Sequence, residues 1–144
     1  MGAAYNAPDS LVEIYVQEAE HGCVARLEYN IVQWSAFWMK LQGVNLTPYS
    51  KLAFDIRADP ERGIPGQMKV ELKRAGNQQV SITYVSGITT GWQTMSVNLA
   101  DFGPTGYTDP LSSLTEMEEL VFTFEASRSG TQGVVYLDNI VLIP

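Results

Sequence analysis

The stretch "ELVFTFEA", residues 119–126, alternates large apolar side chains with smaller or polar ones. Successive side chains of a strand point to opposite sides, so this period of two predicts a strand with two different faces. One face carries Leu120, Phe122 and Phe124, and the other carries Val121, Thr123 and Glu125. A strand with one apolar and one polar face is typical of an antiparallel sheet that covers a core on one side.

The same alternation recurs along the rest of the chain, separated by turns rich in Gly and Pro such as "DPERGIPG" (59–66) and "GPTGYTDP" (103–110). The other segments are 11–18, 23–31, 36–44, 51–59, 68–74, 79–85, 92–99 and 133–143. A chain of 144 residues fits one domain. We therefore predict a single all-β domain over residues 1–144, a two-sheet antiparallel β-sandwich of the jelly-roll type with about nine strands.

Two segments carry further local signals. In "LSSLTEMEEL" (111–120), Ser113 and Glu116 have the spacing of a capping box, which predicts one short helical turn. In "HGCVARLEYNI" (21–31), Cys23 alternates with apolar residues, which predicts an inert buried thiol. The alternative, a nucleophile, has only His21 as a partner, two residues away on the same strand, and is disfavoured.

Composition excludes several classes of partner. The net charge is -7, and no basic run is longer than Lys73-Arg74, so we expect no nucleic-acid binding. No apolar stretch approaches the roughly 20 residues that a membrane helix needs, so we expect no membrane insertion. The single cysteine excludes a disulfide within the chain and a cysteine-rich zinc site.

The outward faces are the informative part of the predicted sandwich. Trp34 and Trp38 are four residues apart and point to the side opposite Phe37, so we expect both on an outer sheet face. Flat indole rings stack on the apolar face of sugar rings, and nearby polar groups bind the hydroxyls. In the alternative interpretation, another segment covers both tryptophans. Tyr107, in the 103–110 loop, is either a second platform or a lid.

Polar side chains from several predicted strands could share that face. The candidates for binding sugar hydroxyls are Lys40, Glu71, Lys73, Thr83 and Glu125. Glu71 and Glu125 could instead form the carboxylate pair of a glycosidase. Solvated acids are common among 16 acidic residues, so we rank catalysis below binding and expect no enzyme.

Two sequence blocks, Trp92 to Phe102 and Gly133 to Ile140, resemble the family-11 carbohydrate-binding modules, within the galactose-binding-like jelly-roll group. The resemblance covers roughly residues 24–144. It implies a non-catalytic domain that binds a β-glucan or related plant polysaccharide chain on a concave sheet face. It also implies a secreted, extracellular protein in which the domain is appended to a glycoside hydrolase or another secreted multidomain protein.

The resemblance also bears on individual residues. It implies that Asp138 is a ligand of a structural calcium ion (Ca²⁺); alternatively, Asp138 hydrogen-bonds the backbone of a neighbouring loop. Trp34 and Tyr107 match positions where the family carries sugar-binding aromatics. The same fold group includes the complex I intermediate-associated proteins, so a protein-interaction or structural module is the alternative function. Such a module would show a contiguous apolar patch with Val85 and Val121 in it.

Overall fold

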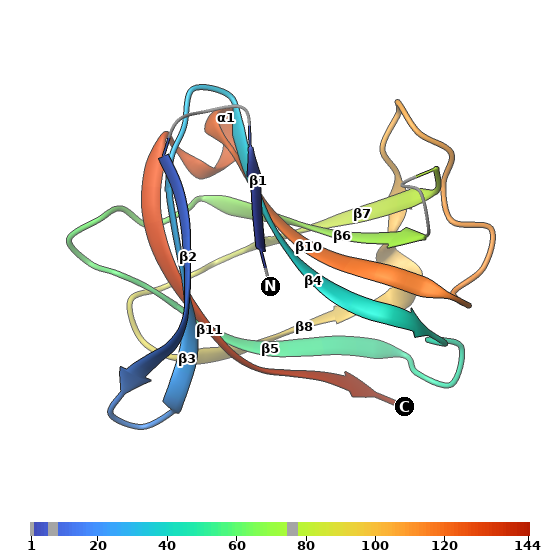
Figure 1. Ribbon diagram of the computed structural model, residues 1–144, viewed down its shortest axis with the longest axis horizontal. Helices are drawn as coiled ribbons and strands as arrows, with labels where there is room; N and C mark the ends of the chain where they lie inside the picture. The colour runs from blue at the N-terminus through green and yellow to red at the C-terminus, as the bar shows by residue number, and fades with distance from the viewer. Residues whose placement is uncertain (1, 6–8, 75–77) are drawn as a thin grey trace.

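Two antiparallel sheets pack face to face in the computed structural model, which describes residues 2–5, 9–74 and 78–144 (Figure 1). Sheet A has the strand order β1 (Gly2–Tyr5), β4 (Trp34–Val44), β10 (Met117–Glu125), β6 (Gln67–Arg74), β7 (Val80–Ser86) and β9 (Gly103–Pro104). Sheet B has the order β2 (Asp9–Glu18), β3 (Gly22–Asn30), β11 (Gln132–Ile143), β5 (Lys51–Ala58) and β8 (Gln93–Asn98). The all-β sandwich is confirmed. All nine predicted segments form strands, and β1 and β9 are additional.

The core lies between the sheets and is built around aromatic contacts across the two layers. Phe122 of β10 meets Phe54 of β5 edge to face, with ring centres 5.4 Å apart. Phe124 stacks on Tyr29 of β3 at 4.2 Å and meets Phe37 of β4 at 5.8 Å. These rings are fully buried, so β10 is fixed with its apolar face inward, as the alternation predicted.

The predicted helical turn within 111–120 is wrong. The segment before Met117 forms bends, and Glu116 has a left-handed φ of 57°, which ends any helical path. Ser113 hydrogen-bonds the Thr115 hydroxyl. A four-residue helix, α1 (Ala126–Ser129), follows β10 instead. No helix among the described residues is long and apolar enough to cross a membrane.

The prediction of a buried Cys23 is also wrong, because this thiol is exposed. The pairing of β3 with β11 ends at Ala25, so Cys23 lies beyond it, in the part of β3 paired only with β2. There Gln17 Nε2 donates to its Sγ at 2.9 Å. The apolar alternation of β3 therefore continues into a part of the strand that does not pack in the core.

Strand β7 faces the opposite way from the sequence expectation. A period of two over residues 79–85 predicts that Tyr84 points inward and that Thr83 and Val85 point outward, but Val85 packs in the core. The register pairs Tyr84 with Lys69 and Thr83 with Val70, which puts Tyr84 on the outer face. Both faces of this segment carry apolar residues, so period alone could not assign them.

The close approach of β11 to β3 makes Gly133 a sensitive position. Gly133 lies opposite Tyr29, and a Cβ built on it would lie 2.6 Å from the Tyr29 hydroxyl oxygen. That hydroxyl donates to the Ser129 carbonyl at 3.0 Å. We expect Gly133→Ala to lower the free energy of unfolding by about 1–3 kcal/mol through overpacking, measured by denaturant titration.

Gly91→Ala is the matched control for this substitution. A Cβ at Gly91 meets no heavy atom within 4 Å, and its φ lies outside the left-handed region, so the change is expected to be neutral or slightly stabilising. Equal stability of the two variants would show that the contact between Gly133 and Tyr29 does not constrain the sandwich.

Candidate functional site

The outer face of sheet A is organised in rows of side chains that lie directly opposite one another on neighbouring strands. We call this surface the sheet A outer face. Its rows are Trp34 and Glu125; Ala36, Thr123, Lys69 and Tyr84; Trp38, Val121, Glu71 and Ile82; and Lys40, Glu119, Lys73 and Val80. Paired residues share a face, so these side chains project away from the core.

A depression of about 320 Å³ lies on this face, which is within the lower range of small-ligand sites. We call it the sheet A pocket. Its lining residues are Trp34, Ala36, Lys69, Glu71, Lys73, Tyr107, Thr123 and Glu125. Trp34 and Tyr107 are exposed, at 37% and 71%, whereas Lys69 and Glu71 are buried. The pocket thus combines accessible aromatic rings with a charged floor.

Tyr107 reaches the pocket from the loop after β9. The Thr105 hydroxyl accepts hydrogen bonds from the backbone N–H groups of Tyr107 and Thr108, which closes the loop tip locally. The Val80 N–H donates to the Asp109 carbonyl at 2.9 Å and attaches the loop to β7. This anchoring presents the Tyr107 ring on a defined loop.

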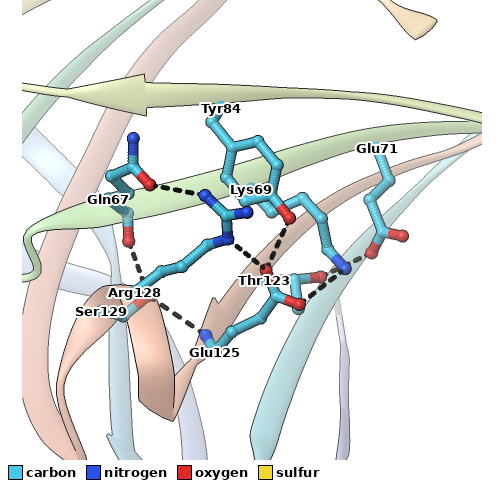
Figure 2. A network of polar contacts seen from close by, with 8 residues as sticks. All are labelled: Gln67, Lys69, Glu71, Tyr84, Thr123, Glu125, Arg128 and Ser129. Atoms are coloured by element: carbon cyan, nitrogen blue, oxygen red, sulfur yellow. Dashed lines mark hydrogen bonds and ion pairs between the residues drawn. The ribbon is translucent and has the colours of Figure 1, made fainter. Parts of the chain in front are cut away.

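Glu125 is the centre of the polar network in Figure 2. Its Oε1 accepts a hydrogen bond from the Tyr84 hydroxyl at 2.8 Å, and its Oε2 accepts one from Lys69 Nζ at 3.3 Å. Arg128 Nε lies 3.9 Å from Oε1, and the guanidinium lies over the Tyr84 ring, 4.2 Å from its centre. Nearby, the Thr123 hydroxyl donates to Glu71 Oε2 at 2.5 Å. The carboxylates are therefore held in place by protein donors.

Helix α1 fixes one side of this network. The Glu125 N–H donates to Ser129 Oγ at 3.1 Å, and Ser129 Oγ donates to the Gln67 carbonyl at 2.6 Å. Arg128 Nη1 donates to Gln67 Oε1 at 3.0 Å. These bonds attach the turn that ends β10 to β6, and they thereby fix the positions of Glu125 and Arg128.

Electrostatics keeps Lys69 charged despite its burial. Burial alone lowers the pKa of Lys69, but attraction to Glu71 and Glu125 outweighs it, so the pKa is raised. The pKa of Tyr84 is also raised, in this case by burial itself and then by the hydrogen bond to Glu125. At neutral pH the floor of the pocket therefore presents the protonated ammonium of Lys69, and the Tyr84 phenol that holds Glu125 keeps its proton as well.

The structure brings five of the eight residues predicted to bind carbohydrate into this pocket. They are Trp34, Glu71, Lys73, Tyr107 and Glu125. Trp38 and Lys40 share the face but do not line the pocket. Trp38 is half-buried with Lys40 Nζ 5.5 Å from its ring centre, and Lys40 forms an ion pair with Glu119. Their binding roles, like those of the pocket residues, stay predictions.

The expectation that Thr83 shares this face is wrong. Thr83 pairs with Val70, a core residue, so its side chain projects to the inner side of sheet A, towards the edge near Met95 and Asp101. The reason is the reversed face of β7. Thr83 therefore cannot act together with Glu71 or Glu125.

Sequence reasoning left three participants out of the predicted set. Lys69 alternates with Glu71 and Lys73, and this spacing could have identified it. Tyr84 was assigned to the core because β7 is ambiguous. Arg128 lies in α1, whose contact with β6 has no signal in the sequence.

Asp138 lies on the outer face of sheet B, away from the sheet A pocket. Its Oδ2 is 3.0 Å from His21 Nδ1, and Asp55 Oδ2 is 3.9 Å from the same nitrogen. The His21 ring stacks on Trp92 with ring centres 3.9 Å apart. Asn139 Nδ2 donates to Asp55 Oδ2 at 2.8 Å. The predicted alternative was a hydrogen bond from Asp138 to a loop backbone, whereas the structure pairs Asp138 with the His21 side chain.

These groups do not fit a calcium ion. Calcium takes six to eight oxygen ligands, whereas a histidine nitrogen faces both carboxylates here. Within residues 2–5, 9–74 and 78–144, no group of three or more His, Cys, Asp or Glu side chains could hold a metal. Calcium at Asp138 stays a prediction that the described donor set does not support.

Chelation tests the calcium prediction directly. From the donor set we expect dialysis against EDTA, followed by saturating calcium, to leave the melting temperature unchanged, with no metal in elemental analysis. A calcium site filled at 100 times its Kd would instead add about 2.7 kcal/mol to the free energy of unfolding. A rise in melting temperature on adding calcium would therefore restore the prediction for Asp138.

The raised pKa of Lys69 predicts a loss of stability in alkali. A lysine in the unfolded chain releases its proton near pH 10.4, before the folded Lys69 does, so the unfolded state binds fewer protons. The free energy of unfolding therefore falls as pH rises through this range. We expect Lys69→Met to flatten that slope between about pH 9.5 and 11 in denaturant titrations.

The control for this experiment is Lys51→Met, which removes an exposed lysine of β5. The free energy of unfolding of this variant should depend on pH as it does in the wild type. The raised pKa values of Tyr29 and Tyr84 contribute a slope of the same sign that persists in both variants. Identical slopes in Lys69→Met and wild type would contradict the ion pairing of Lys69.

Comparison with known proteins relates this geometry to a family. The model of carbohydrate binding domain 30 matches residues 5–144. Comparison with curated proteins finds no match. A family 11 carbohydrate-binding module from Clostridium thermocellum, solved with a β-1,3-1,4-mixed-linked tetrasaccharide, is similar with a TM-score of 0.76 and 17% identity. The alignment covers 99% of this chain and 87% of that one.

Parts of larger proteins are also similar. A β-1,2-glucanase from Parabacteroides distasonis matches with a TM-score of 0.69 and 15% identity, over 99% of this chain and 23% of that one. An exo-β-agarase matches with a TM-score of 0.68 and 13% identity, over 99% and 24%. At these identities the matches establish the fold, which confirms the jelly-roll resemblance to family 11. The family model covers nearly the whole chain, and the chain therefore belongs to the carbohydrate binding domain 30 family.

Proposed function

We propose that this carbohydrate-binding domain holds a β-glucan or a related plant polysaccharide chain in the sheet A pocket and is not itself an enzyme. The observation that carries the proposal is the position of Trp34 and Tyr107 at one polar pocket. Both rings are accessible to solvent. The structurally similar family 11 module with a mixed-linked β-glucan tetrasaccharide supports the choice of ligand.

The chemistry of the pocket suits a sugar chain. An aromatic ring can stack on the apolar face of a pyranose, and the charged floor offers both donors and acceptors to its hydroxyl groups. Lys69 and Lys73 supply donors, and Glu71 and Glu125 supply acceptors. An apolar ligand would remove water from these groups without offering hydrogen bonds to their remaining donors and acceptors, which costs free energy.

The arrangement of the carboxylates supports a non-catalytic role. Glycosidases use one carboxylic acid to protonate the leaving group and a second carboxylate as base or nucleophile. Here Glu71 already accepts from Thr123, and Glu125 accepts from Tyr84 and Lys69. Both carboxylates thus serve a fixed hydrogen-bond network.

The alternative of a protein-interaction module has no specific observation in its favour. Its expected apolar patch included Val85 and Val121, but both are buried, at 7% and 1% exposure. Outside the pocket, the exposed large apolar residues include Leu11 on β2, Val32 and Ile64 in two loops, and Val141 and Ile143 on β11.

The setting of the domain is part of the proposal. The β-1,2-glucanase and the exo-β-agarase are about four times longer than their aligned parts. This supports a domain appended to a glycoside hydrolase or another multidomain protein. Polysaccharides of plant cell walls lie outside cells, so the proposal includes an extracellular, secreted protein.

Removing either aromatic ring tests the proposal. We expect Trp34→Ala and Tyr107→Ala each to weaken binding of soluble mixed-linked β-glucan about tenfold, because ring stacking contributes on the order of 0.5–1.5 kcal/mol beyond the apolar area that it buries. Affinity electrophoresis against a panel of β-glucan, xyloglucan, xylan, mannan and soluble cellulose measures the retardation of each variant. The melting temperature of Tyr107→Ala should stay near the wild-type value, because this side chain is 71% exposed.

Ile64→Ala is the matched control, since Ile64 is exposed, apolar and outside the pocket. It should migrate like the wild type in every gel. Wild-type protein that no member of the panel retards would overturn the choice of ligand. Retardation that survives loss of both rings would overturn the choice of site.

A further inference from the structure

We infer that Lys69 is the main donor to sugar hydroxyls on the floor of the sheet A pocket, and that Tyr84 positions it by holding Glu125. The inference rests on the proposed function and adds to it a binding residue and a positioning residue. Arg128 supports the same arrangement from α1.

Lys69 combines burial with unused donor capacity. Its ammonium has three N–H donors, and among the described residues the structure assigns one hydrogen bond to it, to Glu125 Oε2 at 3.3 Å. The residue is 7% exposed and yet lines the pocket. A hydroxyl that enters the pocket can therefore accept from a charged donor whose desolvation has already occurred on folding.

A purely structural role explains this arrangement poorly. Replacing a buried ion pair by apolar side chains is often neutral or stabilising, so stability alone gives little reason for a lysine here. In the neighbouring row of the same face, β10 and β7 carry the apolar residues Val121 and Ile82, which do not line the pocket. The buried charged residues of β6, Lys69 and Glu71, both line it.

The position of the Lys69 ammonium depends on Glu125, and the position of Glu125 depends on β7 and α1. The Tyr84 hydroxyl donates to Glu125 Oε1 at 2.8 Å, and the Arg128 guanidinium covers the Tyr84 ring (Figure 2). Tyr84 is therefore oriented by Arg128 and in turn orients Glu125. A network that is set before the ligand arrives reduces the entropy lost on binding.

A double-mutant cycle on ligand affinity tests this arrangement. The variants are Lys69→Met, Tyr84→Phe and their combination, titrated with soluble mixed-linked β-glucan by calorimetry. We expect Lys69→Met to weaken binding about tenfold, in line with the loss of a hydrogen bond from a charged donor. We expect Tyr84→Phe to weaken it about threefold, because Glu125 loses one partner but keeps its contacts with Lys69 and Arg128. Since Tyr84 acts through Glu125 on Lys69, the combined variant should bind no more weakly than Lys69→Met alone.

The non-additivity separates positioning from a general structural effect. Independent contributions add in the combined variant, whereas residues of one network do not. Wild-type affinity in Lys69→Met, or full additivity of the two substitutions, would overturn the inference. If Lys69→Met does not fold, the double variant Lys69→Met with Glu125→Gln takes its place, because it removes both charges of the ion pair together. Its affinity is then compared with that of Glu125→Gln alone.

Controls separate this inference from the proposed function. Lys51→Met and Tyr49→Phe make the same chemical changes outside the pocket and should bind like the wild type. Trp34→Ala and Tyr107→Ala are titrated in parallel. If these two variants lose binding while Lys69→Met and Tyr84→Phe keep wild-type affinity, the inference about Lys69 is overturned and the proposed function stands. If the wild type does not bind the glucan, the proposed function fails first.

Discussion

Strand β10 imposes the constraint on which both the core and the pocket depend. It lies in the interior of sheet A between β4 and β6, so its backbone is paired on both sides and its register cannot slip. Phe122 and Phe124 fix its inner face against β5 and β3. With that face fixed, Thr123 and Glu125 must project to the outside, into the pocket. Packing of the core thereby determines the geometry of the site.

The fold was predictable because its signal repeats in every strand. A period of two with turns of Gly and Pro identified all nine main strands, and it placed Glu71 and Glu125 on one face. The signal failed where its physical basis is weak. Strand β7 carries apolar residues on both faces, so the pattern assigned Tyr84 and Thr83 to the wrong faces of the sheet. Cys23 continues the pattern of β3 past the end of its pairing with β11.

The site was predictable only as far as local alternation reaches. Trp34 and Tyr107 were identified as large aromatics with no place in the predicted core, and both line the pocket. Their meeting is a tertiary event, because β4 and the loop after β9 are far apart in the chain. The contact of α1 with β6 through Ser129 and Gln67 is likewise non-local. No short stretch of sequence encodes such a contact.

The outer faces of the two sheets differ in how their aromatic rings and charged groups contact one another. On sheet B, His21 stacks on Trp92 and pairs with Asp138, and Arg57 lies 4.1 Å from the ring centre of Tyr136, so the rings and charges satisfy one another. On sheet A, the charges are paired but the rings of Trp34 and Tyr107 remain accessible. A sugar chain needs accessible aromatic surface next to polar groups that are already oriented. Sheet A provides both, and for this reason we propose that the sugar chain binds on this face.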